Sequence, residues 1–157
     1  MTNLSPLQIE RLKYQPKLPS SLANGINHLV SKEGSATESV ANQEEIKALF
    51  KNTYGKPTVT FETSSQESVS EIRNVGVILS GGQAPGGHNV IAGLYDALKQ
   101  ANSANKLYGF LGGPSGIIEG KYVEFTDSFI DEYRNTGGFD IIGSGRTKLE
   151  TKEQFAV

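Results

Sequence analysis

The sequence predicts an α/β fold with a doubly wound, mostly parallel sheet, and two observations support this prediction. In the second half of the chain, short apolar segments alternate with segments of helical period, which is the order of elements in such sheets. Three of the apolar segments run into glycine-rich loops, at residues 81–87, 112–116 and 143–146. Ligands of doubly wound sheets bind beyond the carboxyl ends of the strands. We therefore expect all three loops to lie at one edge of the sheet.

The elements of the second half are expected in a regular order. Apolar residues predict strands, the first of them buried, at 75–79, 107–111 and 122–125. Apolar residues three and four apart predict a helix over 89–99. A second helix is predicted to start at the N-cap Thr126 and to run to about Arg134. Gly137 and Gly138 are expected to end it.

The first 70 residues are less regular, with four prolines and a Ser/Thr-rich stretch over 58–70. Three segments have the spacing of short helices: 4–12, 21–31 and 43–53. Residues 34–39 are expected to form a polar loop, and residues 58–61 alternate like a short strand. We expect residues 1–70 to form an amino-terminal extension of helices and loops. Residues 71–157 are expected to form the first part of an α/β domain.

Length and composition exclude several classes of protein. The 157 residues suffice for about one domain, and the net charge of -2 gives no basic field that would attract nucleic acid or an acidic membrane. The absence of cysteine excludes disulfides and thiolate metal sites. No apolar run approaches the roughly 18 residues of a membrane span, and the first residues lack the pattern of a signal peptide. We expect a cytoplasmic protein that binds neither nucleic acid nor membranes.

The end of the sequence has the pattern of a helix start. Thr151 occupies the position of an N-cap, and Gln154 three residues later completes a capping box. The sequence stops at Val157 with no glycine or proline as a stop signal. We therefore expect the chain to be truncated at this end, and a frayed natural terminus is the alternative.

The loop at residues 81–87 has the features of a phosphate seat. Backbone N–H groups can surround a polyphosphate only where no side chain stands in the way. Four glycines supply that room: Gly81, Gly82, Gly86 and Gly87. The helix that follows would direct its amino end toward the site. The pattern is neither a Walker loop nor a dinucleotide loop, because no Gly-Lys-Ser/Thr ends it and the glycine spacing differs. A turn that only reverses the chain is the alternative.

Cationic side chains are needed beside this loop, because a helix terminus contributes only about 0.3–1 kcal/mol per favourable charge at exposed sites. Arg146 and Lys148 belong to the third glycine loop and its continuation, and they are the candidates. Arginine offers a forked contact to phosphate oxygens, and lysine offers a point charge. A solvated turn is an equally good interpretation of these two residues. His88 is expected to be a surface or capping residue.

Taken together, these motifs resemble the phosphofructokinase family. Residues 76–93 are similar to its strand, glycine loop and helix, and residues 137–146 resemble the segment that lies beside the phosphoryl donor. The details are similar to the long form of the pyrophosphate-dependent branch. Gln83 stands where ATP-using members typically carry Asp, and residues 7–16 and 109–116 look like that form. The resemblance runs through the whole chain and implies a Rossmann-like sheet that is incomplete in these residues.

The resemblance implies a glycolytic phosphotransferase that transfers a phosphoryl group reversibly between pyrophosphate and the 1-hydroxyl of fructose 6-phosphate, with Mg²⁺. Gly81 and Gly82 would contact pyrophosphate, and Arg146 would lie near its phosphates. Lys148 is a weaker match. The family's Gly-Gly-Asp-Asp segment, which helps hold Mg²⁺, and its Thr-Ile-Asp-Gly-Asp-like segment, which carries the catalytic base, do not occur in this sequence. No catalytic residue or metal ligand is therefore expected here, and we expect this chain alone to be inactive.

Two other functions fit the same residues. One is an ATP-dependent phosphofructokinase, and the other is a non-catalytic regulatory subunit or phosphate-binding module of the same fold. An incomplete sheet leaves strand edges and apolar helix faces without partners. We therefore expect these residues to pair with another copy, as a homo-oligomer, or with the missing part of the protein.

Overall fold

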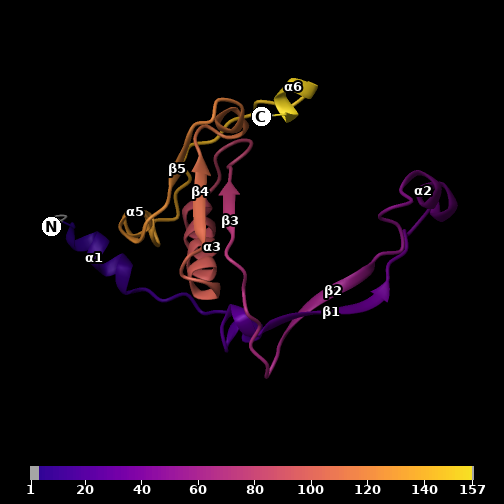
Figure 1. Ribbon diagram of the computed structural model, residues 1–157, viewed down its shortest axis with the longest axis horizontal. Helices are drawn as coiled ribbons and strands as arrows, with labels where there is room; N and C mark the ends of the chain where they lie inside the picture. The colour runs from indigo at the N-terminus through magenta and orange to yellow at the C-terminus, as the bar shows by residue number, and fades with distance from the viewer. Residues whose placement is uncertain (1–3, 157) are drawn as a thin grey trace. The chain divides into compact units, whose positions relative to one another are not determined.

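The computed structural model describes residues 4–156, which form two compact units (Figure 1). The α/β unit consists of the residues up to Lys17 and those from Val69 onward. The hairpin unit consists of Leu18–Ser68. The domain boundary drawn at residue 70 from the sequence stays a prediction.

The α/β unit contains a three-stranded sheet in the order β3 (Asn74–Val77), β4 (Lys106–Phe110) and β5 (Tyr122–Glu124). β3 and β4 are parallel, whereas β4 and β5 are antiparallel, so the sheet of the described residues is mixed. Helix α3 (Gly87–Ala101) connects the two parallel strands and runs alongside them (Figure 1). This strand–helix–strand unit confirms the predicted α/β class.

The hydrophobic core lies between helix α3 and one face of this sheet. Its buried apolar residues are Ile91, Ala92, Tyr95, Leu107, Phe125, Ile130, Ile141 and Ile142. At one end of the core, the buried side chain of Asn105 accepts the backbone N–H of Arg73 at 2.7 Å and donates to the carbonyl of Leu98 at 2.9 Å. These two bonds join the end of helix α3 to the approach of strand β3.

Within the described residues of the α/β unit, the opposite face of the sheet is uncovered. Gly76, Tyr108, Phe110 and Tyr122 line a shallow hollow on it. The Tyr122 ring stands edge-on to the rings of Tyr108 and Phe110, with centroids 5.5 and 5.9 Å away. The continuous apolar run at 75–79 predicted a buried strand. The strand is present as β3, but the predicted burial is wrong for the described residues. Residues of β3 alternate between exposed and half-buried because only one face of the sheet is covered.

The described part of the α/β unit has further short helices: α1 (Pro6–Lys13), α4 (Pro114–Ile118), α5 (Asp127–Tyr133) and α6 (Lys152–Phe155). Helices α1, α5 and α6 begin after Ser5, Thr126 and Thr151, whose side chains each accept a backbone N–H three residues later. Helix α4 replaces part of the loop expected at 112–116, because proline suits the first position of a helix. None of the helices in residues 4–156 is long and apolar enough to cross a membrane.

The hairpin unit is an antiparallel pair of strands, β1 (Leu29–Ala36) and β2 (Pro57–Thr63), with helix α2 (Gln43–Leu49) in the connection. Two 3₁₀ turns, η1 (Ser20–Leu22) and η2 (Ile26–His28), precede β1. The helix predicted over 21–31 is therefore wrong, and the loop predicted at 34–39 begins inside β1. Strand β1 is exposed along nearly its whole length. Its sequence consequently lacks the alternation of apolar and polar residues that indicates a strand.

Candidate phosphate-binding site

The three glycine loops meet beyond the carboxyl ends of strands β3 and β4, as expected. Ser80 forms a parallel bridge with Gly145, and the N–H of Gly81 donates to the carbonyl of Gly145 at 2.9 Å. The N–H of Gly112 donates to the carbonyl of Ile142 at 2.8 Å. The segment 142–145 therefore contacts both the loop after β3 and the loop after β4.

Glycine is required at this junction for two different reasons. Gly81 has φ +100°, in the left-handed region that other residues rarely adopt. A Cβ on Gly113 would lie 2.5 Å from the backbone nitrogen of Gly145 and 3.0 Å from the carbonyl oxygen of Leu79. The backbone of Gly113 lies directly against the backbones of Gly145 and Leu79. A side chain therefore has no room at Gly113, and the loops lie close together.

Arg146 places its guanidinium beside the first glycine loop. A Cβ on Gly82 would lie 3.0 Å from one terminal nitrogen, Nη2, of Arg146. The exposed Arg146 side chain has no hydrogen-bond or ion-pair partner within residues 4–156. Arg134, by contrast, donates to both carboxylate oxygens of Asp96 at 2.7 and 3.0 Å. A guanidinium without a carboxylate partner among the described residues, next to a glycine-rich loop, can make a forked contact with an anion.

Lys148 does not join this arrangement. Its side chain is 81% exposed, and its Nζ lies 4.0 Å from Oε1 of Glu150. The structure thus brings Gly81, Gly82 and Arg146 together and leaves Lys148 in solvent. The role of each of these residues in binding a ligand stays a prediction.

The amino end of helix α3 is partly occupied by backbone. The N–H of Gly86 donates to the carbonyl of Gly137 at 2.8 Å, and the N–H of His88 donates to the carbonyl of Gly138 at 3.0 Å. The positive end of the helix lies at the site as expected. The bond from His88 also means that the segment after helix α5 caps the helix, a contact that the sequence did not indicate.

His88 is the residue that the sequence analysis misjudged. It was expected at the surface or as a cap, but its side chain is buried and touches the segment 136–141. That segment lies about 50 positions further along the chain, and a single sequence carries no signal that pairs the two. The residues 4–156 bring together no three His, Cys, Asp or Glu side chains that could hold a metal ion.

Sequence comparison found related proteins that are named as pyrophosphate–fructose 6-phosphate 1-phosphotransferases or as subunits of one. The chain is 56% identical over 151 residues to the pyrophosphate–fructose 6-phosphate 1-phosphotransferase of Porphyromonas gingivalis, covering 96% of the chain and 27% of that protein. The protein of the same name from Entamoeba histolytica is 49% identical over 154 residues, with 98% and 28% covered. The subunit beta of that name from Solanum tuberosum is 45% identical over 153 residues, with 96% and 26% covered. No protein-family model matches the chain.

A solved structure, Pichia pastoris phosphofructokinase in the T-state, matches 67% of this chain and 14% of that one, at 19% identity and a TM-score of 0.37. This likeness is too distant to add to the argument. The chain spans about a quarter of the length of its sequence relatives. Identity of 45–56% over nearly all of its residues makes this chain a homologue of the pyrophosphate–fructose 6-phosphate 1-phosphotransferases, as its motifs predicted.

Proposed function

We propose that this chain forms the pyrophosphate seat of an enzyme that transfers a phosphoryl group reversibly between pyrophosphate and fructose 6-phosphate. The single observation that carries the proposal is the guanidinium of Arg146, which has no partner within residues 4–156 and lies beside Gly82 at the meeting point of three glycine loops. The relatives are named for these two substrates, which supports pyrophosphate as the anion at this position.

The geometry suits a ligand with several negative charges. Phosphoryl transfer depends mainly on positioning and on neutralising charge. Arg146 is proposed to contact the phosphate oxygens, and Gly82 to let them approach the backbone. Gly81 donates its own N–H to Gly145, so it would act through its conformation. Lys148 would add only a screened charge, because it is exposed and near Glu150.

Several parts of the proposed enzyme rest on the resemblance alone. Mg²⁺ is proposed to be held by residues outside this chain, because residues 4–156 offer no group of ligands for it. A homo-oligomeric assembly and a cytoplasmic location are proposed in the same way. A non-catalytic role remains the second candidate, since plant relatives are named as subunits beta and alpha, at 45% and 37% identity.

Donor choice tests the proposal directly. The full-length protein that contains this chain is purified and incubated with fructose 6-phosphate, Mg²⁺ and either pyrophosphate or ATP. We expect fructose 1,6-bisphosphate to form with pyrophosphate and not with ATP. Formation of fructose 1,6-bisphosphate with ATP but not with pyrophosphate would show that ATP, and not pyrophosphate, is the phosphoryl donor. Formation with neither donor, in a protein shown to be folded, would favour the non-catalytic subunit.

The glycine loop is tested by the substitution Gly82→Val in the same full-length protein. The valine side chain would displace the Arg146 guanidinium and obstruct the seat. We expect the KM for pyrophosphate to rise about tenfold or more, equivalent to at least about 1.4 kcal/mol of binding. Gly93→Val is the matched control, because a Cβ on Gly93 meets nothing within 4 Å. An unchanged KM for pyrophosphate in Gly82→Val would mean that the loop is only a turn.

A further inference from the structure

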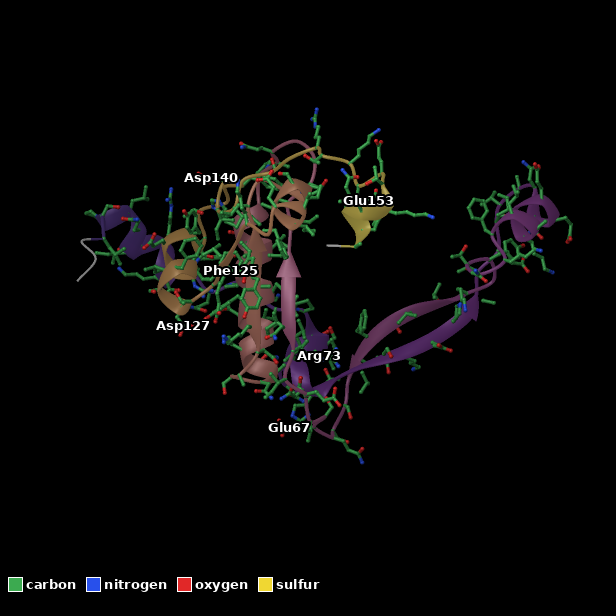
Figure 2. The ribbon with its side chains drawn as sticks, turned by 45° about the horizontal axis from the view of Figure 1, so that its top comes forward. Glu67, Arg73, Phe125, Asp127, Asp140 and Glu153 are labelled. Carbon is green, nitrogen blue, oxygen red and sulfur yellow. The ribbon has the colours of Figure 1, made fainter. Side chains whose placement is uncertain are left out.

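His88 has hydrogen-bond partners at both ring nitrogens, and all of them lie in the segment after helix α5. Its Nε2 lies 3.0 Å from the backbone nitrogen of Asp140 and 3.1 Å from that of Ile141. Its Nδ1 lies 2.6 Å from Oγ1 of Thr136. The Tyr133 ring stands edge-on to the imidazole, with centroids 4.9 Å apart. The imidazole thus spans the two ends of the segment 136–141, where Figure 2 labels Asp140.

The hydrogen bonds determine which nitrogen carries the proton. The hydroxyl of Thr136 donates to the carbonyl of Tyr133 at 2.6 Å, so its oxygen accepts from Nδ1–H. Nε2 then has a free lone pair for the N–H groups of Asp140 and Ile141. The carboxylate oxygen Oδ1 of Asp140 also lies 2.9 Å from Nε2. A proton on Nε2 would satisfy that carboxylate but would leave two backbone N–H groups unpaired.

A proton on Nδ1 and a lone pair on Nε2 are therefore the arrangement that the surroundings favour. The Asp140 side chain is 78% exposed and can bind water instead. A backbone N–H that loses its partner in a buried place costs more than a carboxylate that remains hydrated. His88 consequently acts as an acceptor that anchors backbone, in a fixed tautomer.

Glycines in both segments, the start of helix α3 and residues 136–141, allow the two segments to pack closely. A Cβ on Gly138 would lie 2.5 Å from Cε1 of His88. A Cβ on Gly87 would collide with the ring of Phe139. His88 thus packs on the backbone of Gly138, and Phe139 packs on the backbone of Gly87. Together with the backbone bonds of Gly86 and His88, these contacts form a clasp between the start of helix α3 and residues 136–141.

We propose that His88 is a positioning residue for the donor seat, an inference that rests on the function proposed above. His88 is two residues after Gly86, the last glycine before helix α3, and its acceptor atom anchors Ile141, five residues before Arg146. The clasp therefore sets where the Arg146 guanidinium lies relative to Gly82. His88 touches neither residue and acts on pyrophosphate only through them.

The test compares three substitutions of His88 in the full-length protein. His88→Gln keeps an acceptor near the position of Nε2, whereas His88→Asn reaches only to the position of Nδ1 and His88→Leu removes both. We expect Asn and Leu to raise the KM for pyrophosphate about tenfold or more, because misplacement of a binding group by about 1 Å can cost as much as about 100-fold. The KM for fructose 6-phosphate should change less than about twofold, and His88→Gln should recover most of the pyrophosphate affinity.

Tyr95→Phe is the control for a general loss of stability, because it weakens the same helix away from the clasp. Amide hydrogen exchange over residues 136–146 is measured in parallel. It should be faster than in the wild-type protein in His88→Asn and His88→Leu, but not in His88→Gln. Equal impairment of all three His88 variants, a parallel rise of both KM values, or the same pattern in Tyr95→Phe would overturn the positioning role. Failure of the wild-type protein to use pyrophosphate would instead refute the proposed function, whatever the exchange rates show.

Discussion

At the scale of single residues, two arginines differ in whether a carboxylate holds them. An arginine that is paired with carboxylates has a structural role, whereas one without such a partner is available to a ligand. Arg134 is held by Asp96 and Asp131, and its hydrogen bonds to Asp96 raise its pKa further above the ordinary value. Arg146 has no such carboxylate within residues 4–156. The sequence analysis selected Arg146 from its glycine-rich context. For Arg134, the sequence offers Asp131 three positions earlier as a partner, but not Asp96, which lies 38 positions away.

Tyr95 gives the first stability prediction. Its hydroxyl donates to Oδ1 of Asp127 at 2.8 Å, across to helix α5, where Figure 2 labels Asp127. Burial, followed by the hydrogen bond to Asp127, raises the pKa of Tyr95 to about 12. We expect Tyr95→Phe to lower the free energy of unfolding of the full-length protein by about 1 kcal/mol at pH 8, the usual net contribution of one hydrogen bond.

The pH dependence of this effect has a defined sign. The folded state raises the pKa above the unfolded value of about 10, so the contribution of Tyr95 is complete below pH 10. It is lost as the pH rises from 10 toward 12. Denaturant unfolding at pH 8 and at pH 11 measures the free energy of unfolding with the contribution of Tyr95 complete and with that contribution reduced. The wild-type protein should lose more stability over this range than Tyr95→Phe, and equal losses would contradict the assignment.

At the scale of elements, the sequence predicted those with an apolar pattern or a local cap and failed for strand β1, which has neither. Helix α3 was expected over 89–99 and extends over Gly87–Ala101, because its apolar stripe packs on the sheet. The capping box predicted from Thr151 and Gln154 is present in full, since both partners lie within one turn. Strand β1 has neither an apolar stripe nor a local cap, and it was predicted partly as helix and partly as loop.

The attachment of helix α1 gives a prediction at the same scale. No residue of α1 is buried, and its Leu7 is 59% exposed, so apolar packing holds it weakly. The Asn135 side chain, just after helix α5, donates to the carbonyls of Arg11 at 2.7 Å and Tyr14 at 3.1 Å. Asn135 itself has φ +59°, a conformation that asparagine tolerates better than most residues.

Two substitutions separate the amide from the backbone conformation. Asn135→Gly keeps the left-handed backbone and removes both donors, whereas Asn135→Ala removes the donors and adds strain of about 1 kcal/mol. Trypsin should cleave at Arg11 and Lys13 in α1 about tenfold faster in both variants of the full-length protein, for a loss of about 1.4 kcal/mol. The Tm should be lower in Asn135→Ala than in Asn135→Gly, because only alanine adds backbone strain. Unchanged cleavage would show that α1 is held by something other than Asn135.

At the scale of the whole molecule, the sequence predicted which loops meet but not what fixes them. Glycine content and position after apolar segments identified the loops at Gly81 and Gly145, and the general rule for doubly wound sheets placed them at one edge. The backbone bond between them confirms that placement. The clasp at His88 was missed because its contacts join residues 48 to 53 positions apart. Hydrophobic periodicity and helix caps are local signals, and they predict contacts only between residues within one or two helical turns of each other.

The last prediction concerns what this chain can do alone. It supplies a candidate seat for pyrophosphate, but residues 4–156 offer no metal-binding group, and one aromatic face of the sheet stays uncovered within the described residues of the α/β unit. A phosphoryl group cannot be transferred without an aligned acceptor and neutralised charge. We therefore expect the purified 157-residue chain to form no fructose 1,6-bisphosphate from pyrophosphate and fructose 6-phosphate, under conditions where the full-length protein does. Circular dichroism must show that the chain is folded. Bisphosphate formation by the folded chain would mean that the acceptor site and the catalytic base lie within these residues.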